Sequence, residues 1–215
     1  MIWRSGLWAA PTTSIAEAFS HAPSRLAETY SIDASRPASC VLGALDFLND
    51  LKFLLPAETL ASRAAAHDPS IPTAESQDAA TPPGAVYRCI IDELNPWQPS
   101  HGAHHAVDLL LLFGGFDASL EQNLPDDASP ASGFVQTGRD MRKCFNKFIN
   151  GGEPWDLHDT AAFGPWGTVK YLHRGGAELR MRRRLDHLGI IKGVDGDALE
   201  RVFMDLARGR ISLLN

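Results

Sequence analysis

One short apolar segment constrains the fold of this 215-residue chain more than any other feature. Residues 86–91, VYRCII, are apolar and β-prone, and turn-forming residues lie on either side of them. This pattern predicts a strand buried on both faces, as in a parallel sheet. A parallel strand needs neighbours, yet the sequence offers few other good strands, of which 168–173 is a short candidate.

Most of the remaining chain has the apolar periodicity of helices. The longest N-terminal helix is expected over 38–54, and Pro56 is expected to end it. Its apolar stripe is Val41, Leu45, Leu48 and Leu51, with Asp46, Asn49, Asp50 and Lys52 among the polar positions. Other helices are expected over 11–20, 23–30, 56–66, 133–150, 177–188 and 197–208. The sequence therefore predicts a mostly helical α/β protein.

Two segments are expected to lack regular structure. Residues 68–84 are rich in Pro, Ala, Ser and Thr, which predicts a flexible surface loop. Residues 117–133 are predicted to form a polar loop. Residues 1–10 are apolar and contain Trp3 and Trp8, so they are expected to dock against a segment that precedes them.

Charge and composition exclude some classes of protein. The net charge is −6, which argues against nucleic-acid binding because phosphate neutralisation needs a basic surface. The one basic run fits a solvated helix face better than a phosphate site: Arg180, Arg182, Arg183 and Arg184. No apolar run is long enough to span a membrane, and the N-terminus does not resemble a signal peptide.

The cysteines do not form a recognisable framework. There are three, Cys40, Cys89 and Cys144, and no CxxC pair suggests zinc. Cys89 and Cys144 lie in apolar surroundings and are predicted to be buried free thiols. The count leaves the cellular compartment open.

The most specific motif follows the predicted strand. Residues 102–114, GAHHAVDLLLLFG, resemble the histidine motif of type B carboxylesterases and cholinesterases, which are α/β-hydrolases. Residues 86–100 match the strand and the tryptophan-bearing loop before that motif, and residues 138–155 are similar to a late helix of the family. The segment from 2–8 through the helices to Leu55 looks like the fungal-type branch. The resemblance is weak in 68–84 and in the C-terminal helices.

The resemblance implies a role for each motif residue. His105 takes the position of the catalytic histidine, Gly102 that of the motif glycine and Asp108 that of a structural acid. Phe113 and Gly114 match the closing Phe-Gly pair. His104 has no catalytic counterpart in the family.

The other parts of a serine hydrolase site are not found in these residues. Catalysis needs a serine in a G-x-S-x-G elbow and a carboxylate that holds the histidine tautomer. The only glycines spaced four apart are Gly189 and Gly193, with Ile191 between them, and residues 1–16 contain no Asp or Glu. Residues 1–215 are therefore expected to be the C-terminal part of a type B carboxylesterase domain. The intact enzyme would act on small-molecule carboxylic esters without a cofactor or metal, and this chain alone is expected to be inactive.

Several alternatives stay open at this point. The chain could be a non-catalytic, cholinesterase-like binding protein. His101, His104, His105 and Asp108 form a weak metal pattern, which the family resemblance explains without a metal. Trp97 fits a packing residue better than a substrate contact, and Cys89 an inert thiol better than a nucleophile. The isolated histidines are expected at the surface: His158, His173 and His187. Acyl and alcohol preference are not determined.

Overall fold

The computed structural model describes residues 2–65, 85–99, 102–103, 106–122 and 130–207. The chain divides into two compact units. One unit joins residues 1–60 to residues 180–215, and the other comprises residues 61–179. Each unit has its own core and is described by itself.

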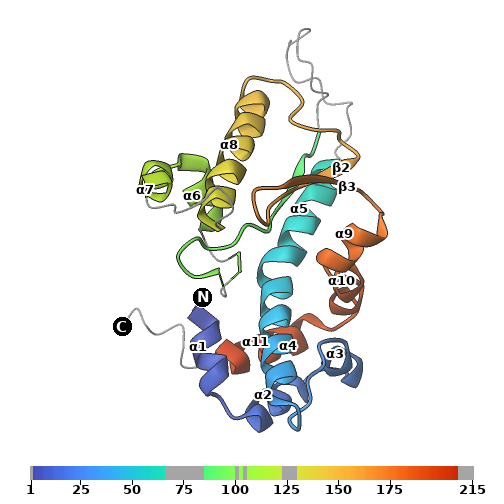
Figure 1. Cartoon of the computed structure of the whole chain (residues 1–215). Coiled ribbons are helices and arrows are strands. Elements are labelled where there is room, and N and C mark those ends of the chain that lie inside the picture. The colour runs from blue at the N-terminus through green and yellow to red at the C-terminus, as the bar shows by residue number, and fades with distance from the viewer. Residues whose placement is uncertain (1, 66–84, 100–101, 104–105, 123–129, 208–215) are drawn as a thin grey trace. The chain divides into compact units, whose positions relative to one another are not determined.

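The first unit is helical throughout its described part (Figure 1). Helix α2 packs against α4 and α11, α1 packs against α4, and α10 packs against α3. The fully buried side chains that form its core come from all of these helices: Leu7, Ile15, Phe19, Leu26, Phe47, Leu48, Ile191 and Val202. The helices are α1 (Ile2–Ala9), α2 (Thr12–Phe19), α3 (Ser24–Thr29), α4 (Pro37–Asn49), α10 (Leu185–Lys192) and α11 (Gly196–Ala207).

Helix α1 packs on a later segment of the chain, helix α4. Leu7 is buried in the core with α4, whereas the side chain of Trp8 is 49% exposed. Helix α1 therefore buries part of its apolar surface within this unit, and about half of the Trp8 side chain is exposed.

The predicted break at Pro56 is wrong. Helix α4 runs into a π-helical segment, Asp50–Leu54, and then into α5, Leu55–Ala65. The N–H group of Leu55 bonds to the carbonyl of Asp50, five residues back. A proline ring clashes with the carbonyl four residues back in a regular α-helix, and the wider π turn ahead of Pro56 relieves that clash.

The apolar stripe of α4 is only partly as predicted. Val41 and Leu48 are buried, and Leu45 and Leu51 pack against the core as partly buried residues. Asp50, predicted at a polar position, is fully buried. A buried carboxylate requires partners that donate hydrogen bonds or carry the opposite charge.

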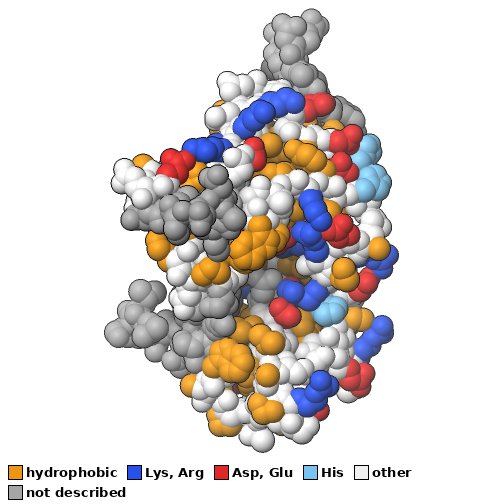
Figure 2. Space-filling model, in the orientation of Figure 1, with side chains coloured by type: hydrophobic (Ala, Val, Ile, Leu, Met, Phe, Trp, Pro, Cys, Tyr) orange, Lys and Arg blue, Asp and Glu red, His pale blue; other side chains and the backbone are white. Residues whose placement is uncertain are grey.

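The second unit contains a three-stranded mixed sheet in the order β1-β2-β3 (Figure 1). Strands β1 and β2 are parallel, with Ile91 opposite Phe163, and β2 and β3 are antiparallel. Helix α8 packs against α6 and α7. The elements are β1 (Arg88–Ile91), α6 (Val107–Phe113), α7 (Asp117–Gln122), α8 (Pro130–Ile149), β2 (Asp159–Phe163), β3 (Val169–His173) and α9 (Ala177–Arg182). Figure 2 shows apolar side chains reaching the surface at several places among charged ones.

The sheet confirms the predicted strands and adds one. Strand β1 lies within the predicted 86–91 and β3 within 168–173. Burial of β1 on both faces is wrong for the described residues, since Ile90 is buried but Cys89 is exposed. Strand β2 was missed, because its sequence DTAAF has only small side chains before Phe163.

Helices differ from the predictions at their ends. Helix α7 lies inside the predicted polar loop and is anchored by buried Leu120. Helix α8 matches the predicted 133–150 closely; Met141 on it is buried, whereas Phe148 is 49% exposed. Gly151, with φ +76°, follows its end. The predicted loop 68–84 lies outside the described residues.

The predicted helix 177–188 is divided into α9 and α10. The division falls at Arg184, which has the left-handed φ of +44°. Among the described residues, no helix combines the length and apolar character needed to cross a membrane.

Candidate active site

The carboxyl ends of β1 and β2 lie at the same edge of the sheet. The two strands are parallel, and their last residues, Ile91 and Phe163, are opposite one another. The N–H group of Asp92 donates to the carbonyl of Phe163 at 2.8 Å, which extends the pairing by one step. The segments that follow the two strands therefore start side by side, where ligands bind in open α/β sheets.

Glu93 joins these two segments through a buried carboxylate. Its side chain is 1% exposed and accepts hydrogen bonds from four donors. Oε1 accepts from the N–H groups of Leu94 at 3.1 Å and Trp166 at 3.2 Å. Oε2 accepts from the N–H group of Gly167 at 3.0 Å and from the Thr137 hydroxyl on α8. The carboxylate is thereby satisfied inside the protein.

Two glycines allow the turn after β2 to pack this closely. A Cβ on Gly164 would lie 2.4 Å from the backbone nitrogen of Glu93. A Cβ on Gly133, near the start of α8, would lie 2.9 Å from the nitrogen of Gly167. The 164–168 turn is therefore held between the end of β1 and helix α8.

The loop whose sequence contains three histidines, residues 94–106, is called the histidine loop and begins directly after Glu93. A backbone hydrogen bond joins Asn95 to Gly102 within it. The N–H group of Asn95 donates to the carbonyl of Gly102 at 3.2 Å, and Gly102 donates to the carbonyl of Pro99 at 2.9 Å. The side-chain oxygen of Asn95 accepts from the N–H groups of Trp97 at 2.9 Å and Gln98 at 3.2 Å. These bonds define a compact turn before the predicted catalytic segment.

His105 and its neighbour His104 lie outside the described residues, as does His101. Two residues in left-handed backbone conformation flank this segment: Gly102 with φ +62° and Ala106 with φ +68°. Helix α6 begins at Val107, and Asp108 lies in its first turn. The catalytic role of His105 stays a prediction.

Arg142 on α8 fixes the far end of α6. Its guanidinium donates to the carbonyl of Leu111 at 2.5 Å and to Asp117 at 2.6 Å. Gly114 ends α6 with φ +59°, and a Cβ there would lie 2.8 Å from the Arg142 side chain. The closing glycine of the motif therefore has a structural explanation, whereas Phe113 before it is 80% exposed.

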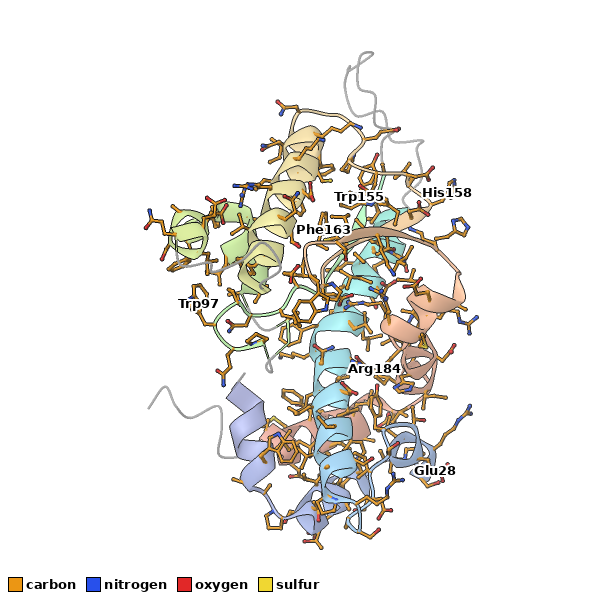
Figure 3. The ribbon with its side chains drawn as sticks, in the orientation of Figure 1. Glu28, Trp97, Trp155, His158, Phe163 and Arg184 are labelled. Atoms are coloured by element: carbon orange, nitrogen blue, oxygen red, sulfur yellow. The ribbon has the colours of Figure 1, made fainter. Side chains whose placement is uncertain are left out.

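Trp97 lies on the outer side of the histidine loop, as Figure 3 shows. Its ring is 55% exposed and makes an edge-on contact with Phe116, with centroids 5.2 Å apart. It is thus only partly a packing residue. Cys89 is exposed and Cys144 half-buried, which corrects the prediction that both are buried. Burial raises the pKa of the Cys144 thiol.

The described residues contain no group of three His, Cys, Asp or Glu side chains that could hold a metal. Since His101, His104 and His105 lie outside them, the absence of a metal there stays a prediction. His158 and His173 are exposed, as predicted. His187 is instead half-buried, with its ring packed against Tyr30 at a centroid distance of 4.9 Å.

A second polar cluster lies in the helical unit. Arg184 (Figure 3) donates to both oxygens of buried Asp50, at 3.0 and 2.7 Å, and lies 3.2 Å from an Asp46 oxygen. The hydroxyl of Tyr30 donates to Asp50 at 3.0 Å, and burial, reinforced by that carboxylate, raises the pKa of Tyr30. The prediction of a solvated basic run is therefore wrong for Arg184. Its neighbour Arg180 is exposed and pairs with exposed Asp186.

Comparison with known proteins gives one informative similarity. The chain is 29% identical over 123 residues to Lipase 3 of Yarrowia lipolytica (strain CLIB 122 / E 150). The alignment covers 57% of this chain and 22% of that lipase. No family model and no solved structure matches. This weak similarity supports a lipase- or esterase-like α/β-hydrolase and, at most, an ester-hydrolase-like function.

Proposed function

We propose that this chain is part of a serine carboxylic-ester hydrolase of the type B carboxylesterase kind and that His105 is its general base. The supporting observation is the position of the histidine loop, which follows the carboxyl end of parallel strand β1. An α/β-hydrolase carries its catalytic histidine in a loop after a late core strand. The left-handed conformations of Gly102 and Gly114 also suit two glycines of the proposed motif.

In this proposal His105 removes the proton of a serine hydroxyl and later protonates the leaving alcohol. The serine and the acid belong to a part of the enzyme outside these 215 residues, in which no G-x-S-x-G sequence occurs. The similarity to only 22% of a lipase supports this arrangement. Residues 1–215 would then be the C-terminal part of the carboxylesterase domain. The substrate would be a small-molecule carboxylic ester, and neither cofactor nor metal is needed.

Glu93 does not replace the missing acid. A carboxylate has about four lone-pair directions, and those of Glu93 are occupied by Leu94, Thr137, Trp166 and Gly167. The side chain is also buried. Orienting His105 would require breaking at least one of these bonds, so we assign Glu93 a structural task.

A second candidate is a non-catalytic, cholinesterase-like binding protein. The lack of an elbow serine in the sequence favours it. In that case the chain would act through its surface alone, and His105 would have no role in turnover.

Co-expression separates the two functions. The chain alone should hydrolyse a short-chain nitrophenyl ester no faster than its His105→Ala variant, because serine and oxyanion hole supply most of the rate. Co-expression with the part of Lipase 3 that precedes the aligned region should raise solubility and restore esterase activity. A well-behaved monomer that gains no activity in this experiment would support the binding protein and contradict the hydrolase.

A further inference from the structure

The turn after β2 presents an exposed tryptophan in an unfavourable backbone conformation. Trp166 has φ +63°, and its side chain is 58% exposed. The left-handed conformation costs a bulky L-residue roughly 1–2 kcal/mol. Such conformations persist where the surroundings impose them, and they cluster at ligand sites. The exposed ring contributes little to the core, so core packing does not explain the conformation.

The contacts that hold Trp166 in this conformation are made to the backbone of the turn. The buried carboxylate of Glu93 accepts from the N–H groups of Trp166 and Gly167 at 3.2 and 3.0 Å. Thr137 holds the same carboxylate from α8. The close approach of Gly164 to Glu93 leaves no room for a side chain at position 164. The turn is therefore rigidly fixed while the indole ring is left largely in solvent.

The turn lies beside the base of the histidine loop. Glu93 precedes Asn95 by two residues, and the N–H group of Asn95 bonds to Gly102. His105 follows Gly102 by three residues, which span at most about 11 Å. A second exposed tryptophan, Trp97, lies in the same loop. The turn that carries Trp166 therefore lies beside the base of the loop whose sequence contains the proposed catalytic histidine.

We propose that Trp166 is a substrate-contacting residue whose indole packs against the apolar acyl or alcohol chain of the ester. Glu93 is its positioning residue. Tryptophan suits this task because it offers a large, rigid apolar surface. The inference rests on the proposed function, since it takes its ligand class from ester hydrolysis.

Photolabelling of the full 215-residue chain tests the contact. The probes are decanoic acid and 1-decanol, each carrying an alkyl diazirine, used in dilute solution. Trypsin should release a fragment of residues 148–170, in which fragmentation locates the label. We expect label within 164–168: from the acid probe if the acyl chain binds there, from the alcohol probe if the alcohol chain does, and from both if the site accepts either.

Substitutions show whether the indole is responsible. Trp166→Ala should lower labelling of 148–170 about tenfold. The matched control, Trp8→Ala, removes a tryptophan of similar exposure from the other unit. This variant should leave the labelling of fragment 148–170 unchanged. The proposal would be overturned if the Trp166→Ala variant is labelled as strongly as the wild type, or if neither probe labels residues 164–168 of the wild type.

Two further variants test positioning by Glu93. Thr137→Val removes a donor to its carboxylate, whereas Thr137→Ser keeps a hydroxyl. We expect Thr137→Val to lower labelling at Trp166 and Thr137→Ser to restore it, with circular dichroism confirming folding of both. Equal labelling in folded Thr137→Val and wild type would contradict the positioning role.

His105→Ala should leave the labelling unchanged. Labelling at Trp166 without His105-dependent hydrolysis would therefore leave the contact standing and the hydrolase proposal refuted. His105-dependent hydrolysis without labelling at Trp166 would refute the contact and leave the hydrolase proposal standing.

Discussion

The buried carboxylate of Asp50 accepts two hydrogen bonds from the guanidinium of Arg184, 134 residues further along the chain. Asp50 opens the π-helical segment after α4, and Arg184 immediately precedes α10. The Tyr30 hydroxyl completes the cluster. This fork-like pair ties together the two sequence segments that form the helical unit.

Removing the arginine should destabilise this unit strongly. Arg184→Ala leaves Asp50 as an uncompensated buried charge, which costs about 3–5 kcal/mol. Urea unfolding followed by circular dichroism measures the loss. The neighbouring Arg183→Ala is the control and should change the free energy of unfolding by less than about 0.5 kcal/mol. Similar small effects in both variants would show that the pair does not stabilise the unit.

The same cluster predicts a loss of stability at alkaline pH. Burial and the neighbouring Asp50 raise the pKa of Tyr30 above its ordinary value of 10.0. The folded state therefore holds the phenolic proton more tightly, so stability is complete below pH 10 and falls as the pH rises above it. The slope from this group approaches about 1.4 kcal/mol per pH unit.

Tyr30→Phe separates that titration from other alkaline effects. The variant should be less stable than wild type at pH 7, because it loses a hydrogen bond to a charged acceptor worth about 1.5–3 kcal/mol. Its free energy of unfolding should fall less steeply between pH 10 and 12. Parallel curves for the two proteins would exclude Tyr30 as the titrating group.

The close contact at the sheet edge predicts an intolerant glycine. Gly164→Ala places a Cβ 2.4 Å from the Glu93 nitrogen at a residue with φ +92° and should cost about 2–3 kcal/mol. Gly115→Ala is the control, since a Cβ there meets nothing within 4 Å. Thermal unfolding compares the two. Equal melting temperatures would show that the turn adapts and that the contact with Glu93 is not rigid.

Much of the secondary structure could be predicted because it depends on local pattern. The apolar run of β1, the periodicity of α8 and the Gly151 that follows it are all visible in short windows. The small side chains of β2 give no such signal, and its pairing with β1 across some 70 residues supplies its stability. The π turn before Pro56 likewise depends on geometry that residue types alone do not specify.

The candidate site was predictable in part for the same reason. The motif glycines Gly102 and Gly114 lie in a contiguous segment, and both have positive φ. Glu93 was missed, although a charged residue two positions after an apolar strand is a usable signal. Its partners Thr137 and Gly167 are 44 and 74 residues away, so the fold alone brings them to its carboxylate.

We propose that His105, and not its neighbour His104, is the general base of an ester hydrolase. Steady-state hydrolysis of a nitrophenyl ester by the complex with the part of Lipase 3 that precedes the aligned region distinguishes the two histidines. Loss of a triad histidine lowers kcat by orders of magnitude, so His105→Ala should lower it by at least about 10³-fold. His104→Ala should retain most of the activity. Activity that survives His105→Ala, or that disappears equally in both variants, would contradict the assignment.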